Sequence, residues 1–173
     1  MRKSMTAAAL TAVVVLAAAT GAGAATTPSP SYTVAGLATF TPQGTTMSLT
    51  GFATGSNGDR GLVRASITSA PLATCSSIGS SCTLTGGTFG LNSSNRSQLT
   101  GTVTGGTVAL VSQAPGCGRQ QFAVDGTASS SSGDVVAFDV VLTQFRLSFR
   151  GTCLALPGAT LVGSVTVGPV MGG

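Results

Sequence analysis

Short runs rich in Val, Thr, Leu and Phe follow one another from Tyr32 onward, separated every eight to fifteen residues by Gly, Ser, Asn or Pro. This spacing is typical of an all-β sandwich or barrel. No window after residue 24 keeps the 3.6-residue apolar period of an amphipathic helix. The pattern therefore predicts a single antiparallel β-sandwich or barrel-like domain of about eight to ten strands, with very little helix. The expected strands span residues 32–40, 46–53, 62–68, 82–89, 97–103, 107–112, 120–128, 134–142, 145–153 and 160–167.

Two of these runs alternate strictly between apolar and polar residues, which indicates that one face of each strand is buried. Met47 and Leu49 alternate with serine and threonine, whereas Phe145, Leu147 and Phe149 alternate with glutamine, arginine and serine. We expect the apolar row of each strand to face the core and the polar row to face solvent.

Turn residues mark several connections between the expected strands. Asn57-Gly58 predicts a hairpin turn, because both residues tolerate positive φ. The four serines at 129–132, followed by Gly133, predict a longer hairpin connection.

A Leu-Thr-Gly phrase begins at Leu49, Leu84 and Leu99, with Leu161-Val162-Gly163 as a looser copy. The phrases share no fixed period, so they do not predict a solenoid or a propeller. We interpret them as a consequence of a composition rich in Thr and Gly, and we expect the glycines inside strands to mark bulges or bends.

The N-terminus has the features of a secretory signal peptide. Arg2 and Lys3 precede an almost wholly apolar stretch of about 13 residues, and Ala22-Gly23-Ala24 supplies the small residues of a cleavage site. The stretch is shorter than the roughly 20 residues that span a bilayer. We therefore expect residues 1–24 to be removed, residues 25–31 to form a flexible leader, and residues 32–173 to form the β domain. The alanine-rich signal favours a bacterial source, and we expect a secreted, extracellular or cell-surface protein with no membrane span after signal removal.

Four cysteines in an exported chain predict two disulfides, because the compartment is oxidising and the count is even. Three pairings are possible. We favour Cys75 with Cys82 and Cys117 with Cys153, since residues 76–81 form a short Ser/Gly turn that brings its flanks together. With no His and no close C-x-x-C spacing, we expect neither a metal site nor a redox pair.

Charged residues make up only 7% of the chain, against roughly a quarter in ordinary soluble domains. There is no His, no Glu and, after signal removal, no Lys, which excludes a histidine triad, a Ser-Lys dyad and a Glu acid/base pair. The acids that remain are Asp59, Asp125, Asp134 and Asp139. We interpret Asp59 and Asp134 as turn residues, and nothing in their spacing favours Asp125 with Asp139 as a glycosidase pair. We therefore expect no enzyme, no catalytic residue and no cofactor.

The most concentrated polar surface in the sequence is the row of Gln144, Arg146, Ser148 and Arg150. On a solvent-facing strand this row is a candidate for binding an anionic polymer through Gln144, Arg146 and Arg150, although a solvated sheet face explains it as well. The six arginines that remain after signal removal, Arg146 and Arg150 included, are scattered rather than clustered, so we expect no nucleic-acid binding.

Three functions remain open for such a domain. The first is a structural or adhesive cell-surface or extracellular component, with self-assembly or a cell-envelope polymer as its partner. The second is a carrier that holds a small apolar ligand inside a barrel or sandwich. The third is an inhibitor of a secreted protease that presents the loop from Cys75 to Cys82. A long unpaired strand edge favours assembly, a deep apolar pocket favours carriage, and a rigid extended loop favours inhibition.

Overall fold

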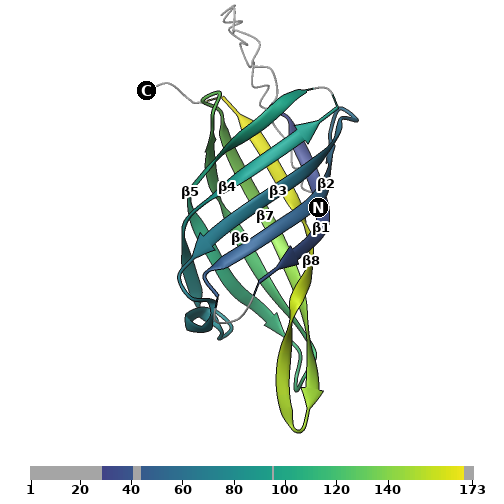
Figure 1. Ribbon diagram of the computed structural model, residues 1–173, viewed down its shortest axis with the longest axis vertical. Coiled ribbons are helices and arrows are strands. Elements are labelled where there is room, and N and C mark those ends of the chain that lie inside the picture. The colour runs from purple at the N-terminus through teal and green to yellow at the C-terminus, as the bar shows by residue number, and fades with distance from the viewer. Residues whose placement is uncertain (1–28, 41–43, 95, 170–173) are drawn as a thin grey trace, which may run out of the picture.

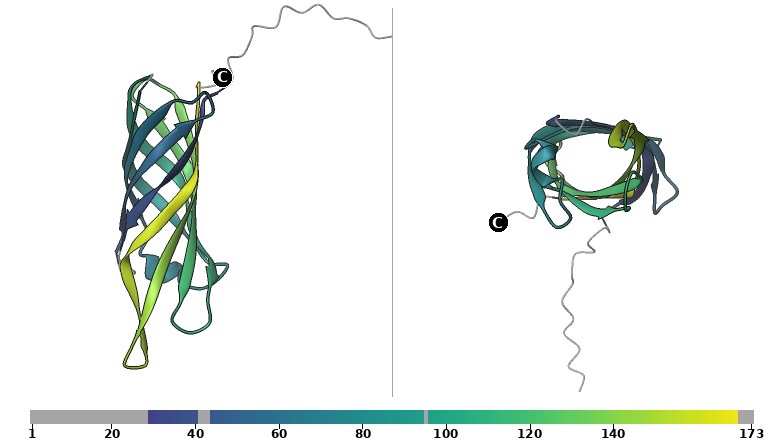
Figure 2. Two further views of the ribbon diagram at one scale, coloured as in Figure 1. Left: turned by 90° about the vertical axis from the view of Figure 1, so that its right-hand side faces the viewer. Right: turned by 90° about the horizontal axis from the view of Figure 1, so that it is seen from below.

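The computed structural model describes residues 29–40, 44–94 and 96–169, so the expected signal peptide and most of the leader lie outside the described residues. The chain forms an eight-stranded antiparallel barrel that is closed by pairing of the first strand with the last (Figures 1 and 2). Each strand otherwise pairs with its neighbours in sequence. The strands are β1 (Ser31–Thr39), β2 (Thr46–Gly55), β3 (Arg60–Ser69), β4 (Ser81–Ser93), β5 (Arg96–Gln113), β6 (Arg119–Ser130), β7 (Val135–Phe149) and β8 (Thr152–Gly168).

The predicted all-β fold with two disulfides is confirmed. The only helical element among the described residues is one 3₁₀ turn, η1 (Leu72–Cys75). The predicted strands at 97–103 and 107–112 are one strand, β5, because the glycines between them bend the strand at a bulge without ending it. The predicted strand at 145–153 is also revised, because it contains the end of β7, a turn and the start of β8. No helix among residues 29–40, 44–94 and 96–169 is long and apolar enough to cross a membrane.

The strands alternate between an apolar interior and a hydroxyl-rich exterior. In β2, Met47, Leu49 and Ala53 are buried, whereas the threonines and Ser48 between them are exposed. The predicted burial of Met47 and Leu49 is therefore confirmed. The same alternation in the other strands fills the barrel with Val, Leu, Ile and Phe, so the core lies inside the ring of strands rather than between two sheets.

Glycines stand where neighbouring strands approach most closely. A Cβ on Gly36 would lie 2.2 Å from the carbonyl oxygen of Thr50, and one on Gly101 would lie 2.1 Å from that of Ser129. The same holds for the last residue of two other phrases, Gly51 and Gly163, whose Cβ atoms would lie 2.7 and 2.2 Å from neighbouring carbonyl oxygens. Three of the four phrases therefore have a structural reason beyond composition, because their glycine stands at a close approach of two strands; Gly86, at the end of the phrase that begins at Leu84, has open space at its Cβ position.

The two ends of the barrel differ in their connections. The connections after β1, β3, β5 and β7 lie at one end, the lower end in Figure 1, which we call the hairpin end. Both disulfides lie there, and they join Cys75 to Cys82 and Cys117 to Cys153 as predicted. They are consistent with an extracellular protein. The predicted hairpin turns at Gly58 and Gly133, both with positive φ, close the opposite end.

We expect Gly36→Ala to lower the free energy of unfolding by about 1–3 kcal/mol, because its Cβ meets the backbone of β2, which cannot move aside without disturbing the barrel. Denaturant unfolding followed by circular dichroism measures the change. Gly90→Ala is the matched control, since its Cβ would meet only a methyl group of Thr100 at 3.8 Å. Equal stability of the two variants would contradict the role given to Gly36.

Candidate binding surface at the hairpin end

The β7–β8 hairpin extends beyond the barrel wall. β6 pairs with β7 only as far as Phe145, and β1 pairs with β8 only from Gly158 onward. β7 and β8 continue to pair with each other as far as Phe149 and Thr152, so the hairpin projects past the other strands (Figure 1). Arg150 and Gly151 both have positive φ at its tip, which suits the twist of a tight two-residue hairpin turn.

The β5–β6 turn supports this projecting hairpin. The disulfide joins Cys117 of the turn to Cys153 of β8. The Arg146 backbone N–H donates to the carbonyl of Gly118 at 2.9 Å, and its side-chain Nη2 donates to the carbonyl of Gly116 at 2.7 Å. Covalent and hydrogen-bonded links therefore hold the hairpin in one orientation relative to the barrel.

Large apolar side chains cover the projecting hairpin. Leu147 and Leu154 are directly opposite each other in the ladder, so they share a face, and Phe145 and Phe149 lie on the same side of β7. The guanidinium of Arg150 lies 5.3 Å from the centre of the Phe149 ring. Each of these apolar residues, with Leu156, is between 39% and 57% exposed. We call Phe145, Leu147, Phe149, Leu154 and Leu156 the apolar hairpin patch.

The structure reverses the faces expected for this segment. Gln144 is completely buried instead of solvent-facing, and the row from Phe145 to Phe149 is exposed. Arg146 is half-buried and bound to backbone carbonyls, so of the three candidate anion-binding residues only Arg150 is freely exposed. Gln144, Arg146 and Arg150 therefore do not form one exposed binding face.

A buried glutamine pair explains this reversal. Gln120 of β6 is directly opposite Gln144, and its amide nitrogen donates to the Gln144 amide oxygen. The Gln144 amide nitrogen donates to the carbonyl of Leu156. Because the amides satisfy each other, they can enter the interior without a large desolvation penalty. Gln120 was missed in the sequence, although it shares its strand face with Phe122 and Val124, which indicates an inward position.

A pocket of about 350 Å³ opens at the hairpin end, and both glutamines of this pair line it. Its walls include Phe40 and Phe122, whose rings meet edge to face with centroids 5.5 Å apart. Ser76, Gln120, Gln144 and Arg146 supply polar side chains to its lining. Pockets of this size accept small organic molecules, and the mouth of a β-barrel is a common place for them.

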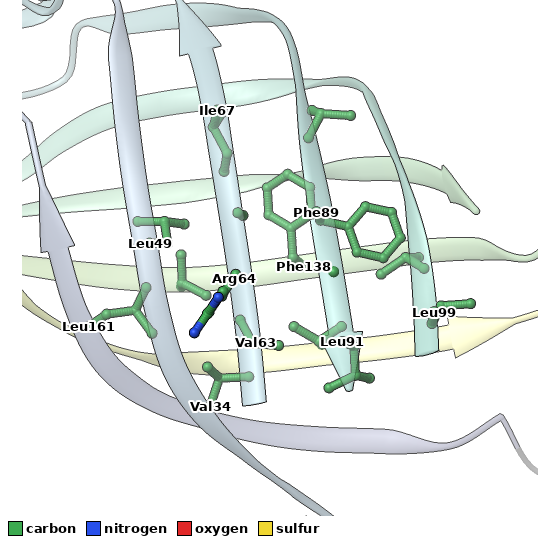
Figure 3. Close-up of a pocket in the computed structure, with 16 residues that line it drawn as sticks. Val34, Leu49, Val63, Arg64, Ile67, Phe89, Leu91, Leu99, Phe138 and Leu161 are labelled. Atoms are coloured by element: carbon green, nitrogen blue, oxygen red, sulfur yellow. The ribbon is translucent and has the colours of Figure 1, made fainter. Parts of the chain in front are cut away.

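The barrel interior has much less room. A second cavity of about 50 Å³ is lined almost wholly by apolar side chains, among them Leu49, Phe89 and Leu161 from three different strands (Figure 3). This space is well below the roughly 150 Å³ of a cavity that holds benzene. The interior is therefore a packed core in this conformation, and the pocket at the mouth is the larger candidate for a ligand.

The acids do not gather at the hairpin end. Asp125 and Asp139 are directly opposite each other on β6 and β7, exposed on the outer wall of the barrel. Asp134 has the predicted turn role, since it accepts a hydrogen bond from Ser132. Asp59 also lies in its predicted turn, between β2 and β3, where its N–H donates to the Asn57 side chain. Its carboxylate is buried and accepts from Tyr32 and Ser94, both distant in sequence. Among the residues that the structure describes, no cluster of three or more acids or cysteines is suited to a metal ion.

Comparison of the chain with protein-family models, curated proteins and solved structures finds no match.

We expect Asp139→Asn to raise the free energy of unfolding by a few tenths of a kcal/mol, because like charges directly opposite each other in a ladder are destabilising. The gain should shrink in high salt, which screens exposed charges. Thermal unfolding at low and high ionic strength measures both effects. Asp134→Asn is the control, since it has no facing carboxylate in the ladder; an equal gain there would refute the repulsion.

Proposed function

We propose that the protein is a secreted, non-enzymatic attachment domain that acts as a structural or adhesive component at a cell surface or in the extracellular space. The observation that carries this proposal is the apolar hairpin patch. Contiguous apolar surface of this kind is rare on a soluble monomer and marks an interaction site. The Cys117–Cys153 disulfide adds support, because a rigid hairpin loses little conformational freedom when it binds.

The barrel itself favours attachment through the hairpin end over assembly through its wall. Closure by β1 and β8 leaves the wall without an unpaired strand edge, and such an edge would be the usual route to strand-by-strand assembly. Threonine and serine, which are neutral and well hydrated, are the commonest residues on the wall, where Leu37, Phe52 and Val162 are the most exposed large apolar exceptions. The hairpin end thus differs in chemistry from the rest of the surface.

The loop from Cys75 to Cys82 lends little support to protease inhibition. It begins in the 3₁₀ turn η1 and continues through a tight turn in which the N–H of Ser80 donates to the carbonyl of Ser77. A substrate-like inhibitory loop needs an extended backbone, whereas the backbone of this loop forms a 3₁₀ turn followed by a second tight turn.

We expect the double variant Leu147→Ser/Phe149→Ser to lose most of its binding to washed cell envelopes of the producing organism, because it removes the tip of the apolar hairpin patch. Sedimentation of purified protein with the envelopes measures the bound fraction. Phe52→Ser on the barrel wall is the matched control, since Phe52 is 75% exposed but far from the hairpin. Undiminished binding of the hairpin variant, or an absence of envelope binding by the unaltered protein, would contradict attachment through this end.

Carriage of a small apolar ligand is a second candidate, favoured by the pocket of about 350 Å³. We expect Ala155→Phe to abolish binding of an anilinonaphthalene sulfonate dye, because the added ring fills the pocket that Ala155 lines. Dye fluorescence measures the binding. Ala35→Phe, at an exposed position of β1, controls for a general effect of an added aromatic ring. Equal dye binding by both variants would exclude the pocket as the binding site.

A further inference from the structure

We propose that the hairpin end binds the surface of an anionic lipid bilayer, with the tip of the β7–β8 hairpin inserted at the boundary between headgroups and acyl chains. This inference rests on the proposed attachment function and names its partner. Three observations carry it: the distribution of exposed apolar side chains, the distribution of charge, and the hydrogen-bonding state of the hairpin backbone.

Exposed apolar side chains are concentrated at the hairpin end. Among the described residues, twelve large hydrophobic side chains are exposed, and seven of them belong to this end. Five form the apolar hairpin patch. Ile78, which is 65% exposed beside η1, and Val111 near the end of β5 are the other two. Of the remaining five, Val135 is at the opposite end and four are on the barrel wall. There Phe52, Val162 and Val141 are joined through Ala35 in one row across β2, β1, β8 and β7, a smaller apolar area with no arginine of the hairpin end beside it. A lipid surface accepts apolar side chains from several loops at once, because it imposes no fixed pocket shape.

The charge at this end is positive only. Arg119 and Arg150 are exposed there, and Arg146 lines the pocket. The chain has no Glu, and its four Asp residues lie elsewhere: Asp59 and Asp134 are at the opposite end, and Asp125 and Asp139 are on the wall. Six residues of strand separate Asp125 from Arg119, which is about 20 Å. This exceeds the Debye length of about 8 Å at physiological ionic strength, so the carboxylates do not cancel the attraction of the arginines for anionic headgroups.

The size of the hairpin fits a shallow insertion. From Phe145 to Phe149 the strand covers about 13 Å, and elements that lie in the membrane interface bury their apolar side chains about 5–10 Å deep. Phe149 and the Leu147–Leu154 pair therefore reach the acyl boundary, while Phe145 stays at headgroup level. Arg150 shares the tip with Phe149, and its long side chain can extend back to a phosphate.

The backbone of the hairpin limits the depth. Peptide groups pair across the hairpin from Arg146 with Ala155 to Phe149 with Thr152. Among the described residues, the outer edges of the two strands have no ladder partner there, since the ladders with β6 and β1 stop at Phe145 and Gly158; the Arg146 N–H alone donates to a carbonyl of the β5–β6 turn on this edge. Unpaired peptide groups are costly in hydrocarbon, which keeps these edges among hydrated headgroups. The hairpin is thus suited to lie in the interface and not to cross the bilayer.

A second copy of the chain fits this surface less well. Two hairpin ends packed against each other would bring Arg119 and Arg150 of both copies together without an acid to neutralise them. An anionic bilayer supplies both the apolar layer and the opposing charge.

Sedimentation with lipid vesicles tests this inference. The protein, exported and processed by a secreting host, is mixed with vesicles of phosphatidylcholine alone or with one third phosphatidylglycerol. We expect binding to the anionic vesicles that is at least tenfold stronger than to the neutral ones and that weakens as salt is raised.

Variants of the hairpin identify the side chains responsible. Arg150→Gln should weaken binding to the anionic vesicles about fivefold, and Leu147→Ser/Phe149→Ser should abolish it. Phe52→Ser and Arg64→Gln, on the barrel wall, are the matched controls and should bind as the unaltered protein does.

Circular dichroism and thermal unfolding establish that each variant is folded. If Leu147→Ser/Phe149→Ser does not fold, Leu154→Ser replaces it, because it changes only one exposed side chain of the apolar hairpin patch. The inference is overturned if the unaltered protein does not bind anionic vesicles, if it binds both vesicle types equally, or if the hairpin variants bind undiminished. Envelope binding that the hairpin variant loses, without any vesicle binding, would overturn the lipid partner while leaving the attachment function intact. Concentration-dependent dimerisation that the hairpin variants lose, without vesicle binding, would assign the surface to a second copy and equally overturn it.

Discussion

Pairing of β1 with β8 is the constraint on which the rest of the molecule depends. It gives every strand two neighbours within the barrel wall, so the backbone is hydrogen-bonded around the whole ring and each side chain must point either inward or outward. A ring of eight strands is narrow, and it brings backbones so close together that glycine is required at contacts such as Gly36 with Thr50. Part of the high glycine content, which alone resembles that of a flexible chain, is therefore a requirement of the closed wall, and another part serves turns such as those at Gly58 and Gly133.

Closure also explains why so few charges suffice. With no exposed edge along the wall, the protein does not need lysines or prolines to prevent strand-by-strand aggregation. Threonine and serine can cover the outside, where β-branched threonine favours the strand conformation and its hydroxyl keeps the surface hydrated. The surface differs most from this hydroxyl-rich exterior at the hairpin end, where β7 and β8 extend beyond their neighbours and present the apolar hairpin patch.

The sequence was sufficient for what depends on local pattern and insufficient for what depends on position along the barrel. Turn glycines, the burial of Met47 and Leu49 and the disulfide between Cys75 and Cys82 follow from neighbouring residues. The orientation of Gln144 does not, because strand alternation defines two faces without saying which one is inside. That choice depends on Gln120, a partner on another strand. The exposure of Phe145 follows from the same choice, because neighbouring residues of a strand face opposite sides and Gln144 faces inward.

The up-and-down order of the strands has a geometric consequence for anything joined to this domain. Because the number of strands is even, β1 begins and β8 finishes at the same end, the one opposite the hairpin (Figure 1). From Gly158 to Gly168 the barrel wall rises by about 25 Å once strand tilt is included. The hairpin is therefore separated from both strand termini by the full height of the barrel. A label or fusion placed beside Ser31 or Gly168 would face away from the hairpin end.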